Sequence, residues 1–231
     1  MPLFLDTSDL NQIQQAVKLG VIAGVTTNPK ILAKAGVCQD NLKQVILSIV
    51  TLVKGPVSVE LTEGTIQGML EQAKVFGGWD REHIVIKVPM GLEELEVVKG
   101  LKDLGLKTNV TGIMSSSQAF LAAASGATYV SIFAGRIRDM GYDADPVIAE
   151  TAKLILQEQF SSKIIVGSIR HMMDVVHALR AGAHIITVPP EILKKMAWNP
   201  NTDLTIAEFN REWESTKKFP LELEKSLKDN D

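Results

Sequence analysis

The sequence has almost no cysteine, no long apolar run and little net charge, and each shortage removes a class of protein. Cys38 is the only cysteine among 231 residues, so an intrachain disulfide is excluded and a reducing, cytoplasmic setting is expected. No apolar stretch approaches the length of a membrane span, and residues 1–6 lack the basic start of a signal peptide. A net charge of −3 gives no basic field for nucleic acid or anionic lipid. We therefore expect neither nucleic acid nor membrane as a partner.

Metal-ligand patterns are also lacking. His83, His177 and His184 are not accompanied by suitably spaced carboxylates or cysteines, and His171 is interpreted as a loop or first-turn residue. We therefore predict no metal site.

The most informative stretch is 84–89, an apolar and largely β-branched run with Lys87 in its middle. Such a run is typical of a strand buried on both faces, as in a parallel sheet covered by helices. An ammonium group there would lose most of its hydration, which favours the neutral amine that Schiff-base chemistry requires. The alternative is that Lys87 reaches solvent from a strand end or pairs with a carboxylate.

Strand-like and helix-like segments alternate along the chain. The expected strands cover 3–7, 21–25, 57–61, 84–89, 107–112, 128–134, 163–168 and 184–189. Eight β-then-α units predict a (β/α)₈ TIM barrel, with a doubly wound open sheet as the alternative. Ser8 is expected to cap the first helix, and a loop rich in glycine and aspartate is expected after Arg136.

The last part of the chain predicts an additional C-terminal helix. Ile206, Phe209 and Trp213 share one helical face, and Pro220 is expected to end or kink the helix. We interpret 1–231 as one barrel domain in which 202–231 is a helical extension. Its apolar stripe requires a covering surface, either the barrel or a neighbouring subunit.

Polar residues follow or interrupt most of the expected strands. In a parallel barrel they converge on one mouth, where the chemistry of such barrels takes place. They are Asp6, Thr26, Thr27, Asn28, Glu60, Lys87, Asn109, Thr111, Ser131, Arg136, Ser168 and Arg170.

Three of these groups suit proton transfer beside an amine. Asp6 could carry the proton of a substrate hydroxyl, while Glu60 and Thr111 could hold a water that serves a carbinolamine. Alternatively, Asp6 is a helix cap or turn residue, and Glu60 only neutralises Lys87 as a structural ion pair.

Arg136, Ser168 and Arg170 form a plausible phosphate cradle, because guanidinium groups match phosphate oxygens, and this predicts a phosphorylated substrate. The alternatives are that the two arginines form surface ion pairs, that Ser168 is only an N-cap, and that Asn28 belongs to a turn or cap.

Six motifs occur in the order seen in the transaldolases. They are Leu5-Asp6-Thr7-Ser8, Gly24-Val25-Thr26-Thr27-Asn28-Pro29, Ile86-Lys87-Val88-Pro89, Asn109-Val110-Thr111, Gly135-Arg136 and Ser168-Ile169-Arg170. Over nearly its whole length the chain resembles the small microbial transaldolases, a group that includes fructose-6-phosphate aldolase.

The resemblance implies a Schiff base on Lys87 and a general acid/base, Asp6, at the C4 hydroxyl of the substrate. It implies that Glu60 and Thr111 position the relay water. The expected substrate-binding residues are Thr27, Asn28, Asn109, Ser131 and Phe133 around the dihydroxyacetone unit, and Arg136, Ser168 and Arg170 around the phosphate.

The implied reaction belongs to the pentose phosphate pathway. It transfers dihydroxyacetone from fructose 6-phosphate or sedoheptulose 7-phosphate to erythrose 4-phosphate or glyceraldehyde 3-phosphate. The iminium is the electron sink, so no cofactor is implied. Members of this group are typically decamers built from pentamer rings, so a homo-oligomer is expected.

Two positions bear on the choice between transferase and lyase. In the aldolase branch of the family that the chain resembles, a Gln stands at the position of Glu60 and a Tyr at the position of Phe133. In that branch the Tyr helps hold a water that protonates the carbanion. The residues found here favour transaldolase over fructose-6-phosphate aldolase, which releases free dihydroxyacetone. A non-catalytic sugar-phosphate-binding barrel is the third hypothesis.

The chain departs from the usual small-transaldolase motifs at five positions near these groups. They are Lys30, Gly112, Met114, Ile132 and Ala134. Every proposed reactive group is retained, so the departures are expected to affect packing, turnover and acceptor preference more than the class of reaction.

Overall fold

The protein, for which a computed structural model describes residues 3–216, contains a closed parallel barrel. Its strands are β1 Leu3–Asp6, β2 Gly24–Thr26, β3 Val57–Glu60, β4 Ile84–Pro89, β5 Lys107–Ile113, β6 Tyr129–Phe133, β7 Lys163–Gly167 and β8 Ile185–Val188. Each pairs with the next, and β8 pairs with β1. The predicted TIM barrel is confirmed, and the open-sheet alternative is wrong.

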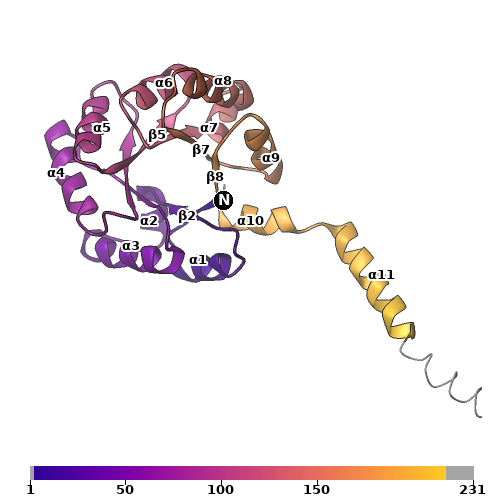
Figure 1. Cartoon of the computed structure of the whole chain (residues 1–231). Helices are drawn as coiled ribbons and strands as arrows, with labels where there is room; N and C mark the ends of the chain where they lie inside the picture. Colours follow the sequence, from indigo (N-terminus) through magenta and orange to yellow (C-terminus); the bar gives the residue numbers. More distant parts are fainter. Residues whose placement is uncertain (1–2, 217–231) are drawn as a thin grey trace, which may run out of the picture. The chain divides into compact units, whose positions relative to one another are not determined.

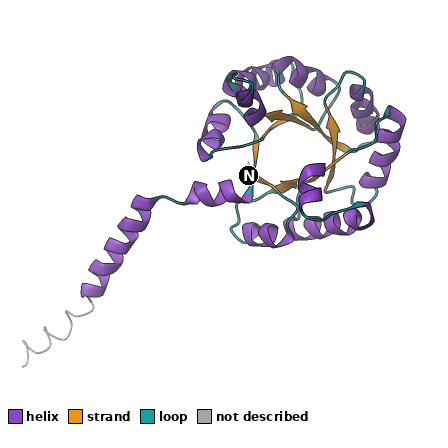
Figure 2. Ribbon diagram, turned by 180° about the vertical axis from the view of Figure 1, so that it is seen from behind, coloured by secondary structure: helices purple, strands orange, loops and turns teal. Residues whose placement is uncertain are grey.

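Helices surround the ring of strands, as Figure 1 and Figure 2 show. They are α1 Leu10–Val17, α2 Pro29–Lys34, α3 Gln39–Val53, α4 Ile66–Gly77, α5 Glu94–Asp103, α6 Ser116–Ala124, α7 Ala134–Asp139, α8 Ala144–Gln157 and α9 Met172–Arg180. After β8 the chain continues with α10 Pro190–Ala197 and α11 Pro200–Thr216. No helix within residues 3–216 is long and apolar enough to cross a membrane.

The chain divides into two compact units, Met1–Leu193 and Lys194–Asp231. The first contains the whole barrel, and the second contains α11. The apolar residues Ile206, Phe209 and Trp213 of α11 are more than half exposed. Pro220 lies outside the described residues, so its predicted effect on the helix stays a prediction, as does the homo-oligomer.

Alternate strand residues belong to two separate apolar clusters. The smaller cluster consists of buried strand residues: Phe4, Val85, Tyr129, Ile165 and Ile185. Their strand neighbours, such as Leu5 and Ile86, belong to the larger cluster, which includes the helix residues Ile13 and Ile49. Because successive side chains of a strand point to opposite faces, the smaller cluster fills the barrel interior and the larger one joins strands to helices.

This alternation places the site. Two residues beyond the interior positions Phe4, Val85, Tyr129 and Ile185 lie Asp6, Lys87, Ser131 and Thr187. These side chains therefore also point into the barrel, one layer closer to the carboxyl ends of the strands. The aromatic ring of Phe4 fills the space beside Gly24, where an added Cβ would lie 2.7 Å from two ring carbons.

Several local expectations were wrong. Asp9, not Ser8, caps α1, because its side chain accepts hydrogen bonds from the backbone N–H groups of Asn11 and Gln12. The chain after β6 forms α7 directly, where a loop was expected; six residues are too few for helical periodicity to show in the sequence. The second strand starts only at Gly24, three residues later than predicted.

The departure at Gly112 has a structural explanation. Gly112 has φ +77°, and the pairing of β5 with β6 shifts register between Val110 and Ile113. A glycine suits this irregularity, because other residues rarely adopt that backbone conformation.

Candidate active site

A cavity of about 530 Å³ lies at the end of the barrel where the strands finish. Eight predicted site residues line it: Asp6, Asn28, Lys87, Ser131, Phe133, Arg136, Ser168 and Arg170. The other four predicted residues, Thr27, Glu60, Asn109 and Thr111, do not line the cavity. Three of those four are buried in or beside strands, and Glu60 is partly exposed.

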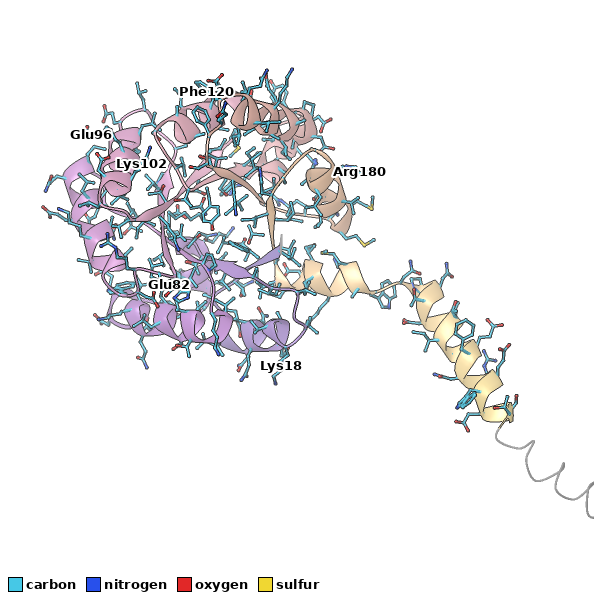
Figure 3. The ribbon with its side chains drawn as sticks, viewed as in Figure 1. Lys18, Glu82, Glu96, Lys102, Phe120 and Arg180 are labelled. Carbon is cyan, nitrogen blue, oxygen red and sulfur yellow. The ribbon has the colours of Figure 1, made fainter. Side chains whose placement is uncertain are left out.

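Lys87 is the centre of the site. Its side chain comes from the middle of β4 and is almost fully buried, whereas Lys18 and Lys102 lie on the outer helices labelled in Figure 3. The Nζ atom of Lys87 forms an ion pair with Glu60 Oε2 at 2.9 Å and donates a hydrogen bond to the Thr27 carbonyl at 3.1 Å. Strand register explains the pair, since Glu60 of β3 lies directly opposite Lys87.

The pairing considered for Glu60 and Lys87 is therefore present, and it places a carboxylate oxygen within hydrogen-bonding distance of the buried amine. The Phe133 ring centroid lies 5.9 Å from Nζ, within the range of a cation–π contact.

Asn109 and Thr111 provide buried polar groups beside Lys87. Asn109 of β5 lies opposite Lys87 in register, and its Nδ2 donates to Ser58 Oγ at 3.2 Å. Among the described residues, Asn109 Oδ1 and Thr111 Oγ1 are buried and have no hydrogen-bond partner. Unpaired buried polar groups are rare in native proteins, and these two are available to a ligand or a water.

Asp6 accepts a hydrogen bond at Oδ1 from Thr26 Oγ1 at 2.7 Å and does not cap a helix. Burial raises the pKa of Asp6 above its ordinary value of 3.8. The Thr26 hydrogen bond and the charge of Lys87 oppose this rise, while Glu191 and Glu60 add to it. A carboxyl group in these surroundings is a better base once ionised than an exposed aspartate.

Asn28 and Thr27 both have structural roles in the turn after β2. Asn28 caps α2, with its Oδ1 accepting from Ile31 N at 2.9 Å, yet it also lines the cavity. The cap expected as an alternative is therefore confirmed, and the residue also contributes to the cavity wall. The hydroxyl of Thr27 donates to the Ser58 carbonyl, so its side chain is committed to joining β2 and β3.

The opposite part of the site contains Arg136, Ser168 and Arg170. Both arginines are exposed, and the Arg170 guanidinium forms an ion pair with Asp139. Ser168 is no helix cap, since His171 occupies the N-cap position of α9. Instead Ser168 has φ +58°, a left-handed conformation that few non-glycine residues adopt.

Close packing brings these groups together. At Gly135 an added Cβ would collide with the Ser168 carbonyl oxygen and would lie 2.8 Å from both Ser168 Oγ and Arg170 Nε. The absence of a side chain at Gly135 therefore lets the start of α7 touch the loop after β7.

A carboxylate network holds the backbone of that loop. Asp174 Oδ2 accepts from the N–H groups of Arg170 and His171, both at 2.9 Å. Its other oxygen pairs at 3.0 Å with Arg138, which also binds Asp145 at 2.8 Å. Three helices, α7, α8 and α9, thus fix the position of Arg170.

Comparison with known proteins gives the family. The sequence model of the transaldolase/fructose-6-phosphate aldolase family matches residues 3–230. The chain belongs to that family.

Curated relatives agree over nearly the full length. A probable transaldolase of Desulforudis audaxviator (strain MP104C) is 41% identical over 218 residues, covering 94% of this chain and 100% of the relative. A probable transaldolase of Moorella thermoacetica is 42% identical over 217 residues, covering 94% and 99%. A solved structure of a mandelate oxidase mutant with a monooxide FMN adduct has a TM-score of 0.57 at 15% identity, covering 83% of this chain and 65% of that one, and it shares the fold alone.

In this member of the transaldolase/fructose-6-phosphate aldolase family, several site residues escaped sequence reasoning. Thr187 lines the cavity from β8, and its signal was the same as that of Lys87, one polar residue within an apolar strand. Ser58 and Glu191 were missed as well. Asp139 and Asp174 had no sequence signal. Their arginine partners, Arg170 and Arg138, lie more than twenty residues away in the sequence, and the hydrogen bonds of Asp174 to the N–H groups of Arg170 and His171 depend on the geometry of a loop. Within residues 3–216, no three His, Cys, Asp or Glu side chains are grouped as metal ligands.

Proposed function

We propose that the protein is a transaldolase that moves a dihydroxyacetone unit between sugar phosphates through a Schiff base on Lys87. The observation that carries the proposal is an almost fully buried lysine inside the barrel, 2.9 Å from a carboxylate and at the wall of a cavity that also contains Asp6. An amine with a proton acceptor beside it, and a second carboxylate nearby, is the arrangement that ketose cleavage needs.

The first step is formation of the iminium. Lys87 transfers a proton to Glu60, and the free amine attacks the C2 carbonyl of the ketose phosphate. The same proton returns to the carbinolamine hydroxyl, which leaves as water. We assign to Thr111 Oγ1, which is buried and has no protein partner among the described residues, the role of holding a water that carries this proton.

The second step is cleavage of the C3–C4 bond. Ionised Asp6 accepts the proton of the C4 hydroxyl, C4 becomes the aldehyde of the departing aldose phosphate, and the bonding electrons enter the iminium. The enamine that remains on Lys87 then attacks an acceptor aldehyde, and Asp6 returns the proton to the new hydroxyl.

In the proposed complex, residues near Lys87 and residues near the two arginines bind different parts of the substrate. The amide groups of Asn28 and Asn109 and the hydroxyl of Ser131 suit the hydroxyl groups of the dihydroxyacetone unit. Arg136 and Arg170 suit the phosphate, for which guanidinium groups form paired hydrogen bonds. Arg170 would then share its guanidinium between the phosphate and Asp139.

Transfer is favoured over release of free dihydroxyacetone by the residue at position 133. Phe133 places an apolar ring next to Lys87 and offers no hydroxyl to orient a water toward the enamine. We propose that the enamine waits for an aldehyde, with fructose-6-phosphate aldolase activity as the alternative.

The test is reductive trapping. Sodium borohydride added with fructose 6-phosphate is expected to leave a dihydroxyacetone-sized adduct on Lys87, located by mass spectrometry of the digested protein. Erythrose 4-phosphate added beforehand should deplete the adduct. Lys18→Gln changes an exposed lysine that directly follows α1. It is the control, and Lys87 in this variant should be labelled as in the wild type.

Three outcomes separate the hypotheses. An adduct depleted by the acceptor supports the transferase. Steady release of dihydroxyacetone without an acceptor supports the lyase. Ligand binding without any adduct on Lys87 would overturn the Schiff-base mechanism and leave a binding barrel.

A further inference from the structure

Asp6 lies at the end of a chain of two threonine hydroxyls that starts on the last strand of the barrel. Thr26 Oγ1 is 2.7 Å from Asp6 Oδ1, and Thr187 Oγ1 is 2.6 Å from Thr26 Oγ1. The first distance is typical of a hydroxyl hydrogen bond and the second is slightly shorter than typical. The chain joins β1, β2 and β8, which are neighbours in the closed sheet.

The direction of the two hydrogen bonds follows from counting protons. A hydroxyl has one proton to donate, and an ionised carboxylate can only accept. When Asp6 is ionised, Thr26 therefore gives its proton to Asp6, and the proton between the two threonines belongs to Thr187. Thr187 donates to Thr26, and Thr26 donates to Asp6.

Burial makes this chain effective. Thr26 and Thr187 are 3% and 4% exposed, so bulk water competes little for either hydroxyl. Gly167 on the neighbouring strand leaves room for Thr187, since an added Cβ there would lie 3.3 Å from the Thr187 methyl group. Hydrogen bonds to an ionised group are strong, and a donor that itself accepts a hydrogen bond is strengthened further.

We propose that Thr187 is a positioning residue. By donating to Thr26, it directs the Thr26 hydroxyl to donate its hydrogen bond to Asp6, which keeps that carboxylate ionised and oriented to receive the proton of the substrate C4 hydroxyl. The inference rests on the proposed function, in which Asp6 is the general base. Thr187 itself exchanges no proton with the substrate in this scheme.

The other charged groups near Asp6 make the two hydroxyls necessary. Burial disfavours the carboxylate, and Glu60 of β3 and Glu191 of α10 add like charge, whereas the charge of Lys87 of β4 opposes them. Lys87 is itself paired with Glu60, and in the proposed cycle its nitrogen is neutral as the free amine and again in the enamine. The hydroxyl chain is the stabilising influence that does not change as the Schiff base forms.

The decisive variants are Thr187→Val, which removes the hydroxyl at nearly constant shape, and Thr187→Ser, which retains it. Thr151→Val is the matched control, because Thr151 is another buried threonine whose hydroxyl donates one hydrogen bond, 2.7 Å to the Val147 carbonyl in α8. The readouts are the pH profile of kcat for transfer, the pKa of Asp6 from ¹³C carboxyl NMR, and borohydride trapping on Lys87.

For Thr187→Val we expect the pKa of Asp6 to rise by roughly one unit, because a stabilising influence on the carboxylate is weakened. The acidic limb of the kcat profile should move to higher pH by the same amount. At a fixed pH on that limb, kcat should fall by up to about tenfold, with KM nearly unchanged. Thr187→Ser should restore both the profile and the rate, and Thr151→Val should resemble the wild type.

The proposal fails if Thr187→Val leaves the pKa of Asp6 and the acidic limb where they are in the wild type, or if Thr187→Ser behaves like Thr187→Val. Failure of the proposed function has a different signature: wild-type Lys87 would not be trapped by borohydride. The NMR titration still reports on the hydroxyl chain in that case.

Discussion

The two parts of the cavity are built differently. On the lysine side, Lys87, Glu60 and Asn109 lie in register on adjacent strands, and Lys87 is nearly inaccessible to solvent. On the arginine side, the exposed Arg136 belongs to α7 and the exposed Arg170 to the loop after β7, where ion pairs and a left-handed serine fix the backbone. The proposed chemistry thus rests on rigid strands, and the proposed phosphate recognition rests on a short helix and a loop.

The difference has an energetic side. Breaking a buried pair leaves an unpaired charge in a poorly solvated place, whereas the surface pair contributes little to folding. The lysine side should therefore affect activity and stability together, and the arginine side should affect activity alone.

Lys87→Met provides the largest expected effect. The variant has no amine to form a Schiff base, so kcat should fall by about 10⁴-fold or more. It should also lower the free energy of unfolding by about 3 kcal/mol, because Glu60 loses its partner. Activity assays and chemical denaturation measure the two losses.

The control is the double variant Lys87→Met with Glu60→Gln, which removes the remaining charge and should recover most of the stability but no activity. Equal instability in the single and double variants would contradict the view that the ion pair is what makes this side of the site fragile.

Arg170→Gln should change recognition without changing the fold. Loss of a charged hydrogen bond to phosphate predicts a rise in KM for fructose 6-phosphate of about 10-fold to 100-fold. Thermal stability should change little, since the pair with Asp139 is about half exposed on both sides.

Dihydroxyacetone, which has no phosphate, supplies the matched comparison. Its trapping on Lys87 by borohydride should be the same in Arg170→Gln and in the wild type. A parallel loss with both compounds would mean that Arg170 shapes the lysine side as well.

Asp6→Asn should have an effect on stability that depends on pH. Because the pKa of Asp6 is raised, the folded protein binds this proton more tightly than the unfolded chain. The stability of the wild type therefore falls as pH rises from 3.8 through the raised pKa, and the loss is complete above it. An asparagine does not titrate, so the Tm of the variant should rise relative to that of the wild type as pH increases through this range, with no such gain at acidic pH.

Thermal unfolding of both proteins between acidic and neutral pH measures this gain. The variant should at the same time lose C3–C4 cleavage, so the adduct that borohydride traps on Lys87 should have the mass of the whole fructose 6-phosphate instead of that of dihydroxyacetone. A difference in Tm that stays constant with pH would argue against a raised pKa of Asp6.

Much of the fold could be predicted from the sequence, because strand periodicity and turn residues are local signals. All eight strands lie within or next to the predicted ranges. The exceptions are places where the local signal is weak or misleading: α7 is too short to show periodicity, and the choice of Asp9 over Ser8 as the cap depends on where the first turn starts.

The site divides in the same way. Lys87 and Asp6 could be found because a polar residue in or at the end of an apolar strand is unusual, and the register of a parallel barrel then brings them to one mouth. The sequence did not reveal the left-handed conformation of Ser168. It also did not reveal the roles of Asp139 and Asp174, which depend on how α7 lies against the loop after β7. These contacts depend on the close approach at Gly135, which no periodic pattern encodes.

The burial of Lys87 also determines how the lysines of the protein react with amine-modifying reagents. Lysines such as Lys99, whose side chain is 70% exposed, present their amines to any acylating reagent in solution, while that of Lys87 is 4% exposed. A bulky amine-reactive probe would modify the outer helices first and leave the centre of the barrel intact. An inhibitor that reaches Lys87 has to enter through the cavity as a sugar does, so selectivity arises from the route of access before any bond is made.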